Sequence, residues 1–277
     1  MKLKLATIIV VFAQAIIAPI TTVGQLSIVA PKKLPALFPG ANSLTPMWTN
    51  RGPEQVEMEI KGALFQAGSK LALQLPLEIV EKLRLLPNQA ALMPINFEVP
   101  EVRAKTLFVI QWQDPSAKAL GKTELKVYPS DLLRELELMA GDTALGIFNL
   151  DAKFETGFRN SKVKSERLEQ DGIGGYAGKL LIAGGEQAQD SSRETLIAVA
   201  RRGAVVVCIV AHSDDEILRP NFSARAYGAG VVVFVQETFL DHFDTNPESQ
   251  LRLVEICRMA MKPGTPELPM ILQKNSQ

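Results

Sequence analysis

Hydrophobic and polar residues alternate in steps of two over the first half of the chain. Residues 55–61 show the pattern most clearly, with charged and apolar side chains taking turns. This spacing is typical of strands that turn one face to a core. Further strand candidates are 70–75, 92–99, 106–112 and 122–128. Together they predict an all-β sandwich over residues 53–129, while 77–86 fits either a helical turn or a strand.

The pattern changes after Pro129, where apolar runs alternate with helical periodicity. Buried strands are predicted at 144–150, 179–183, 204–211 and 230–236. Helices are predicted from Ser130 or Asp131 to Met139, and after capping boxes at 191–194 and 245–248. Strand and helix in this order predict an α/β doubly wound domain over residues 130–262, followed by a tail at 263–277. Residues 151–178 are polar and give no assignment.

The start of the chain has the features of a secretory signal peptide over residues 1–24. Lys2 and Lys4 precede an apolar stretch, and small residues follow it. An uncleaved anchor is the alternative, but the stretch is shorter than the roughly 20 residues that a membrane span needs. We therefore expect an exported protein (periplasmic, secreted or surface-associated) with no membrane span after cleavage. The proline-rich residues 25–52 are expected to be a linker or an irregular first strand.

Composition narrows the class of protein. Lys+Arg and Asp+Glu both number 30, so the net charge is zero, which does not favour nucleic-acid binding. Two Cys and two His exclude a disulfide framework and a cysteine-rich zinc module. In an oxidising compartment Cys208 and Cys257 either form one disulfide or remain buried thiols, and their spacing does not decide between these.

Residues 179–210, with Tyr227-Gly228-Ala229-Gly230 and the apolar run after it, resemble the class I glutamine amidotransferase-like fold. That resemblance implies a flavodoxin-like domain, preceded here by an immunoglobulin-like sandwich. Similar domains accompany exported glycosidases. The family's nucleophile is a Cys at a sharp turn, whereas Cys208 lies inside an apolar run. We therefore expect a catalytically degenerate, non-enzymatic domain.

One short motif points to metal chemistry. Ala211-His212-Ser213-Asp214-Asp215-Glu216 resembles the Ala-His-Pro-Asp-Asp-Glu motif of the zinc-dependent N-acetylglucosaminyl deacetylases. The resemblance implies that His212 and Asp215 bind zinc and that Asp214 acts as the base, with His242 as the remaining ligand. Zinc would make hydroxide available for attack on an amide. Ser213 replaces the family's Pro, and Pro220 follows closely, so a solvated loop is the alternative.

Two other groups of residues are candidates for binding. Gly184, Gly185 and Glu186 follow a buried strand, where open α/β sheets bind ligands, or they form a simple turn. Trp48 and Trp112 could stack on sugars, although Trp112 alternates like a core residue.

The leading hypothesis is an exported, non-enzymatic binding or assembly protein without a cofactor. The first alternative is a zinc-dependent deacetylase or amide hydrolase. The second is a carbohydrate-associated accessory module, which would present an exposed aromatic platform. The partner is an unidentified protein or carbohydrate.

Overall fold

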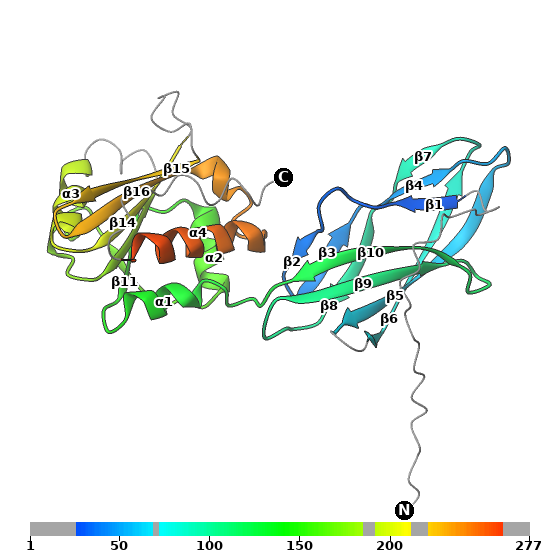
Figure 1. Ribbon diagram of the computed structural model, residues 1–277, viewed down its shortest axis with the longest axis horizontal. Helices are drawn as coiled ribbons and strands as arrows, with labels where there is room; N and C mark the ends of the chain where they lie inside the picture. Colours follow the sequence, from blue (N-terminus) through cyan, green and yellow to red (C-terminus); the bar gives the residue numbers. More distant parts are fainter. Residues whose placement is uncertain (1–25, 69–71, 185–191, 212–220, 263–277) are drawn as a thin grey trace, which may run out of the picture.

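The computed structural model describes residues 26–68, 72–184, 192–211 and 221–262. The predicted signal peptide and the predicted tail lie outside these residues. The described chain has two halves, the first made of strands and the second of strands and helices (Figure 1).

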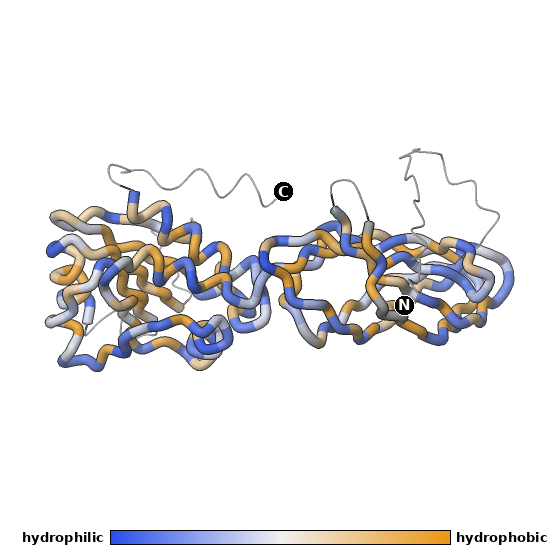
Figure 2. The backbone as a smooth tube through the Cα atoms, turned by 90° about the horizontal axis from the view of Figure 1, so that it is seen from below, coloured by the Kyte–Doolittle hydropathy of each residue, from blue (hydrophilic) through white to orange (hydrophobic). Residues whose placement is uncertain are grey.

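The largest sheet of the first half contains five strands. Its order is β2-β10-β9-β5-β6, and all neighbours are antiparallel except β2 and β10. The bounds are β2 (Ala36–Leu37), β5 (Val56–Ala67), β6 (Ala72–Leu85), β9 (Thr106–Gln113) and β10 (Ala119–Val127). The ambiguous residues 77–86 thus fall almost entirely in a strand. The alternation seen in the sequence appears in Figure 2 as hydrophobic and hydrophilic segments that take turns along these strands.

A second layer comes largely from residues expected to be a linker or an irregular first strand. Residues 25–52 instead hold β1 (Leu26–Val29), β2, β3 (Gly40–Leu44) and β4 (Met47–Asn50). Strand β4 pairs with β1 and with β7 (Ala90–Leu92), and β3 pairs with β8 (Ile95–Val99). The four prolines of this region suggested irregular chain, but prolines at strand ends are compatible with a sheet.

The β3–β8 and β4–β7 pairs share one register. Leu44 pairs with Ile95 and Met47 pairs with Leu92, so the residue numbers of every pair add up to the same total. Between the two pairs, the backbone N–H of Met93 donates to the carbonyl of Pro46 at 3.2 Å. A proline has no N–H to donate, so Pro46 and Pro94 interrupt the hydrogen bonding without shifting the register. We call this continuous pairing of 40–49 with 90–99 the ladder.

The inward faces of the two layers share one core. Trp48 from the ladder and Trp112 from β9 are both fully buried, with ring centroids 5.6 Å apart in an edge-to-face arrangement. The Trp112 Nε1–H donates to Thr123 Oγ1 at 2.9 Å. The expectation that Trp112 belongs to the core is therefore confirmed, and Trp48 belongs to it as well.

The second half contains a six-stranded sheet with the order β12-β11-β13-β14-β16-β15. Five strands are parallel, and β15 runs antiparallel at one edge. The bounds are β11 (Leu145–Phe148), β12 (Ser165–Leu168), β13 (Leu180–Gly184), β14 (Val205–Val210), β15 (Phe222–Tyr227) and β16 (Gly230–Gln236).

Helices pack on both faces of this sheet. The helices α1 (Arg134–Ala140), α2 (Ala152–Asn160) and α4 (Pro247–Ala260) share a core with one face. Helix α3 (Arg193–Arg201) and the 3-10 helix η1 (Ile173–Gly175) cover the other face, so α3 and α4 lie on opposite sides in Figure 1.

The prediction of a doubly wound α/β domain is wrong. Among the residues that the structure describes, strands make up 44% and helices only 21%, and the sheets are several and mixed. Strand β15, which the sequence did not predict, returns to β16 through a tight turn at Gly228, where φ is +60°. Between β12 and β13 the described helical structure is only η1. Within the described residues, the regular helix that the prediction required after each strand is therefore not found between β12 and β13.

Helix starts also differ from the predicted capping boxes. At α3 the residue before the helix is Ser192, whose hydroxyl donates to Gln170 Oε1 instead of capping the helix. At α4 the cap is Asn246, whose side chain accepts from the backbone N–H of Glu248 at 3.0 Å. Helix α1 begins at Arg134 without a side-chain cap.

The two halves are joined by ion pairs at the start of α4. The Glu248 carboxylate pairs with the ammonium groups of Lys33 and Lys126, both from the first half. Tyr128 is buried at the same junction, and the Lys105 ammonium lies 5.7 Å from its ring centroid. Burial, then the negative charges of Glu248 and Glu255, raise the pKa of the Tyr128 hydroxyl.

Candidate functional site

Gly184, the first of the predicted ligand-binding residues, lies at the carboxyl end of β13 and contacts the neighbouring loop. Its carbonyl accepts from the Asn149 side-chain amide at 3.2 Å. A Cβ at this position would come within 2.9 Å of Leu150 Cδ2. The glycine is therefore needed for close packing between the segments that follow β11 and β13. Gly185 and Glu186 lie outside the described residues, so their predicted role in binding stays a prediction.

Other polar groups at this edge of the sheet were not singled out from the sequence. Asn149 has a φ of +47°, which few side chains other than Asn adopt. The Lys153 ammonium, from α2, pairs with the carboxylate of Glu237, which begins the 3-10 helix η4 (Glu237–Leu240). Asn149 and Glu237 each follow a buried strand closely, and that position was the signal that could have revealed them.

The residues of the predicted zinc site are only partly described. His212, Asp214 and Asp215 lie outside the described residues. His242 is exposed, with a φ of +53°, and its Nε2 lies 3.4 Å from Asp241 Oδ2. Within the described ranges, no three His, Cys, Asp or Glu side chains gather into a metal site. The zinc hypothesis stays a prediction.

The two cysteines are buried thiols on opposite faces of the six-stranded sheet. Cys208 packs with the α3 side and Cys257 with the α4 side. Burial raises the pKa of each thiol to about 12. At neutral pH both sulfurs therefore carry their protons, and neither has the thiolate character of a catalytic cysteine.

The tryptophans do not form a sugar-binding platform. Trp48 and Trp112 are turned into the core of the first half, away from solvent. The Trp48 Nε1–H is buried and has no hydrogen-bond partner among the described residues.

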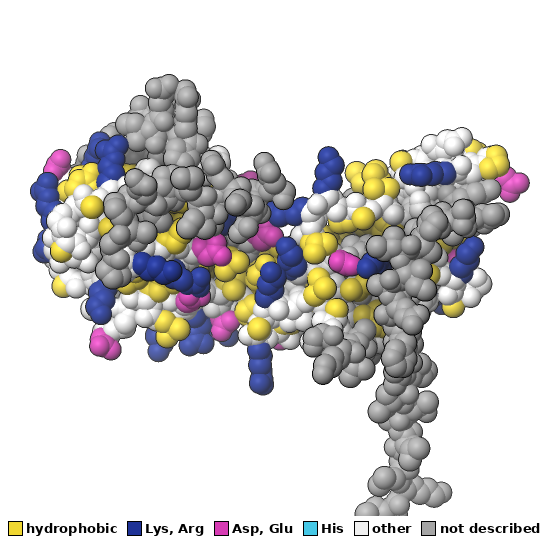
Figure 3. Space-filling model, in the orientation of Figure 1, with side chains coloured by type: hydrophobic (Ala, Val, Ile, Leu, Met, Phe, Trp, Pro, Cys, Tyr) yellow, Lys and Arg dark blue, Asp and Glu magenta, His cyan; other side chains and the backbone are white. Residues whose placement is uncertain are grey.

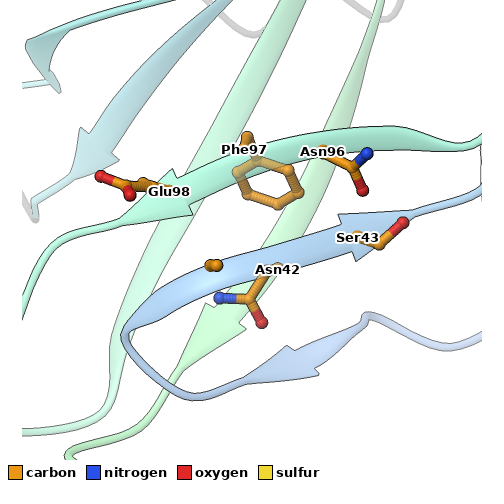
Figure 4. Close-up of a pocket in the computed structure, with 6 residues that line it drawn as sticks. Asn42, Ser43, Asn96, Phe97 and Glu98 are labelled. Carbon is orange, nitrogen blue, oxygen red and sulfur yellow. The ribbon is translucent and has the colours of Figure 1, made fainter.

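An open recess lies over the β3–β8 part of the ladder. Its volume is about 560 Å³, and it is lined by Ala41, Asn42, Ser43, Asn96, Phe97 and Glu98 (Figure 4). Asn42 is engaged locally, since its amide donates to the carbonyls of Phe38 and Gly40, each at 2.9 Å. Phe97 is buried and belongs to the core of the first half, while its neighbours Asn96 and Glu98 are exposed.

Outward side chains continue from the recess along the ladder. Every second residue is exposed, through both prolines, and we call this set the ladder face: Ala41, Ser43, Thr45, Met47, Leu92, Pro94, Asn96 and Glu98. Met47 and Leu92 form a cross-strand pair and are exposed by 37% and 66%. Figure 3 shows hydrophobic side chains gathered at the surface of the first half. The ladder face is thus apolar at one end and polar at the other.

No sequence signal marked the ladder face. The two segments that form it lie far apart in the chain, and the prolines of residues 25–52 indicated a linker or an irregular first strand. The alternation within 92–99 was recognised, but the pairing that creates the recess was not.

No helix within the described residues is long and apolar enough to cross a membrane.

The sequence matches no protein-family model, and no curated protein matches it. Three of the solved structures with weak similarity illustrate the comparison. Alkylpurine DNA glycosylase AlkC from Pseudomonas fluorescens has a TM-score of 0.30 and 10% identity, over 38% of this chain and 31% of that one. The sporulation control protein Spo0M from Bacillus subtilis has a TM-score of 0.30 and 12% identity, over 45% of this chain and 61% of that one. The GH3 β-glucosidase of Bifidobacterium adolescentis has a TM-score of 0.27 and 7% identity, over 38% of this chain and 17% of that one. The chain thus spans less than two thirds of each of these proteins, and it resembles them only in part of its fold.

Proposed function

We propose that this is an exported protein that acts by binding another protein through the ladder face, without catalysis. The observation that carries the proposal is the exposed Met47–Leu92 pair on the ladder, which also carries an open recess lined in part by Ser43, Asn96 and Glu98. Apolar surface bordered by polar groups is typical of protein interaction sites. Leu92, Met47 and Pro94 offer apolar area to a partner, while Ser43, Asn96 and Glu98 offer hydrogen-bonding groups.

The chemistry of the ladder face supports binding over catalysis. Its polar groups are two hydroxyls, one amide and one carboxylate, and these side chains make no hydrogen bond or ion pair with any described residue. Hydrogen bonds from such solvated groups add little binding free energy, but they fix the orientation of a partner that covers them. Apolar contact would provide the affinity, and the polar end would provide the specificity.

Site-directed photocrosslinking in the producing cells tests this proposal. A photoreactive amino acid replaces Thr45, at the centre of the ladder face, or Leu138, which is 81% exposed on α1. We expect a discrete adduct from position 45 that is absent from position 138. The adduct should disappear when Met47→Ser and Leu92→Ser are added. No adduct from position 45, or the same adduct from both positions, would overturn the proposal.

A further inference from the structure

The ladder face carries its apolar and charged groups at a fixed separation. Leu92 and Glu98 lie on the same continuous line of strand residues, with Pro94 and Asn96 between them on the same face. At about 3.3 Å per residue, the two side chains are separated by roughly 20 Å. From one end to the other, the ladder face is therefore apolar at Leu92, hydrogen-bonding at Asn96 and anionic at Glu98.

The recess at the anionic end has room for a long side chain. Ala41 pairs directly with Glu98 across the two strands, and Ser43 pairs with Asn96. Because Ala41 and Ser43 are short, a side chain from above reaches the Glu98 carboxylate over the β3 backbone. Figure 4 shows Asn96 and Glu98 on the same strand with Phe97 between them. Phe97 is a buried, inward residue of β8, so the amide and the carboxylate share the outward face.

Glu98 has no countercharge within the described part of the chain. It is exposed, and no described Lys, Arg or His forms an ion pair with it. Other glutamates of the same half do have such partners, as in the Lys122–Glu124 pair at 2.6 Å. A cation brought by a partner would therefore not have to displace an existing ion pair. Charge complementarity of this kind mainly sets orientation and specificity.

We propose that the ladder face binds an extended segment of a partner protein. This segment places apolar side chains on Met47 and Leu92 and inserts a lysine or arginine into the recess against Glu98. An extended chain presents side chains on one face at every second residue, which matches the spacing of the ladder face. The inference rests on the proposed function and adds the chemistry of the partner.

Selection from a displayed library of random peptides tests the inference on the purified mature chain. We expect the selected peptides to combine apolar residues with a lysine or arginine about six positions away. Their affinity, measured by fluorescence anisotropy, should fall about tenfold for Glu98→Gln, since a charge-assisted hydrogen bond is lost. It should also fall for Leu92→Ser and with added salt.

The matched control is Glu101→Gln, which removes an exposed carboxylate just beyond β8 and should leave the affinity unchanged within about twofold. Selected peptides without a basic residue, or equal effects of the Glu98 and Glu101 substitutions, would overturn the inference. If position 45 still gives its adduct in cells, the proposed function would stand although the inference about the basic segment had failed. If that adduct is missing, both fall together.

Discussion

At the scale of single residues, Gly62 shows how the core of the first half is constrained. It pairs with Trp112 across β5 and β9, and a Cβ there would lie 2.6 Å from Trp112 Cζ3. The tryptophan cannot move aside easily, because its Nε1–H is bonded to Thr123 and its ring packs against Trp48. Gly62 follows directly after the predicted alternating run 55–61, and the sequence gives no sign that the Trp112 ring packs against it.

We expect Gly62→Ala to destabilise the protein by about 1–3 kcal/mol through overpacking. The control is Gly175→Ala, where an added Cβ meets no atom within 4 Å and φ is not positive. Denaturant unfolding measures both. Equal stabilities for the two variants would show that the packing around Trp112 adapts at little cost.

At the scale of elements, the sequence predicts what is encoded locally. The runs 106–112 and 230–236 match β9 and β16 almost residue for residue, because each pattern is complete within its own strand. The ladder could not be predicted in the same way, since its strands are separated in the chain by β5 and β6. Strand β15 was not predicted because its residues are mixed in polarity.

At the start of α4, the capping residue in the structure differs from the one that the sequence motif predicts. The sequence predicts Thr245 as the cap, yet the Thr245 hydroxyl donates to the carbonyl of His242 at 3.4 Å while Asn246 caps the helix. Glu248, expected to complete the capping box, pairs with lysines of the first half instead.

Asn246→Ala should therefore lower the free energy of unfolding by about 1 kcal/mol, the usual contribution of a cap. Thr245→Ala should cost less than about 0.5 kcal/mol, as expected for a substitution that removes only a long hydrogen bond. Thermal unfolding of both variants distinguishes them. A larger loss of unfolding free energy for Thr245→Ala than for Asn246→Ala would mean that Thr245 is the cap, as the sequence predicts.

At the scale of the whole molecule, the junction between the halves depends on charge. Tyr128 is buried beside Glu248 and Glu255, so the pKa of its hydroxyl is higher in the folded protein than in the unfolded chain. A raised pKa means that stability from the neutral phenol is fully present below about pH 10 and is lost as pH rises through the folded-state pKa.

Glu248→Gln should lower the pKa of the Tyr128 hydroxyl by removing one negative charge, while burial still keeps this pKa above its ordinary value. Ultraviolet titration of the phenols, compared with Tyr128→Phe to assign the signal, measures the change. A Tyr128 pKa that does not respond to the substitution would mean that Glu248 is not close to the ring in solution.

The central claim is that the ladder face holds a partner protein, and the size of the native complex tests it most directly. Sedimentation of the protein extracted from its producing cells should show a species larger than the 30.3 kDa chain. Met47→Ser with Leu92→Ser should shift that species to the monomer, while Leu138→Ser should leave it unchanged. A monomer in the unsubstituted protein, or a complex that survives the double substitution, would contradict the account.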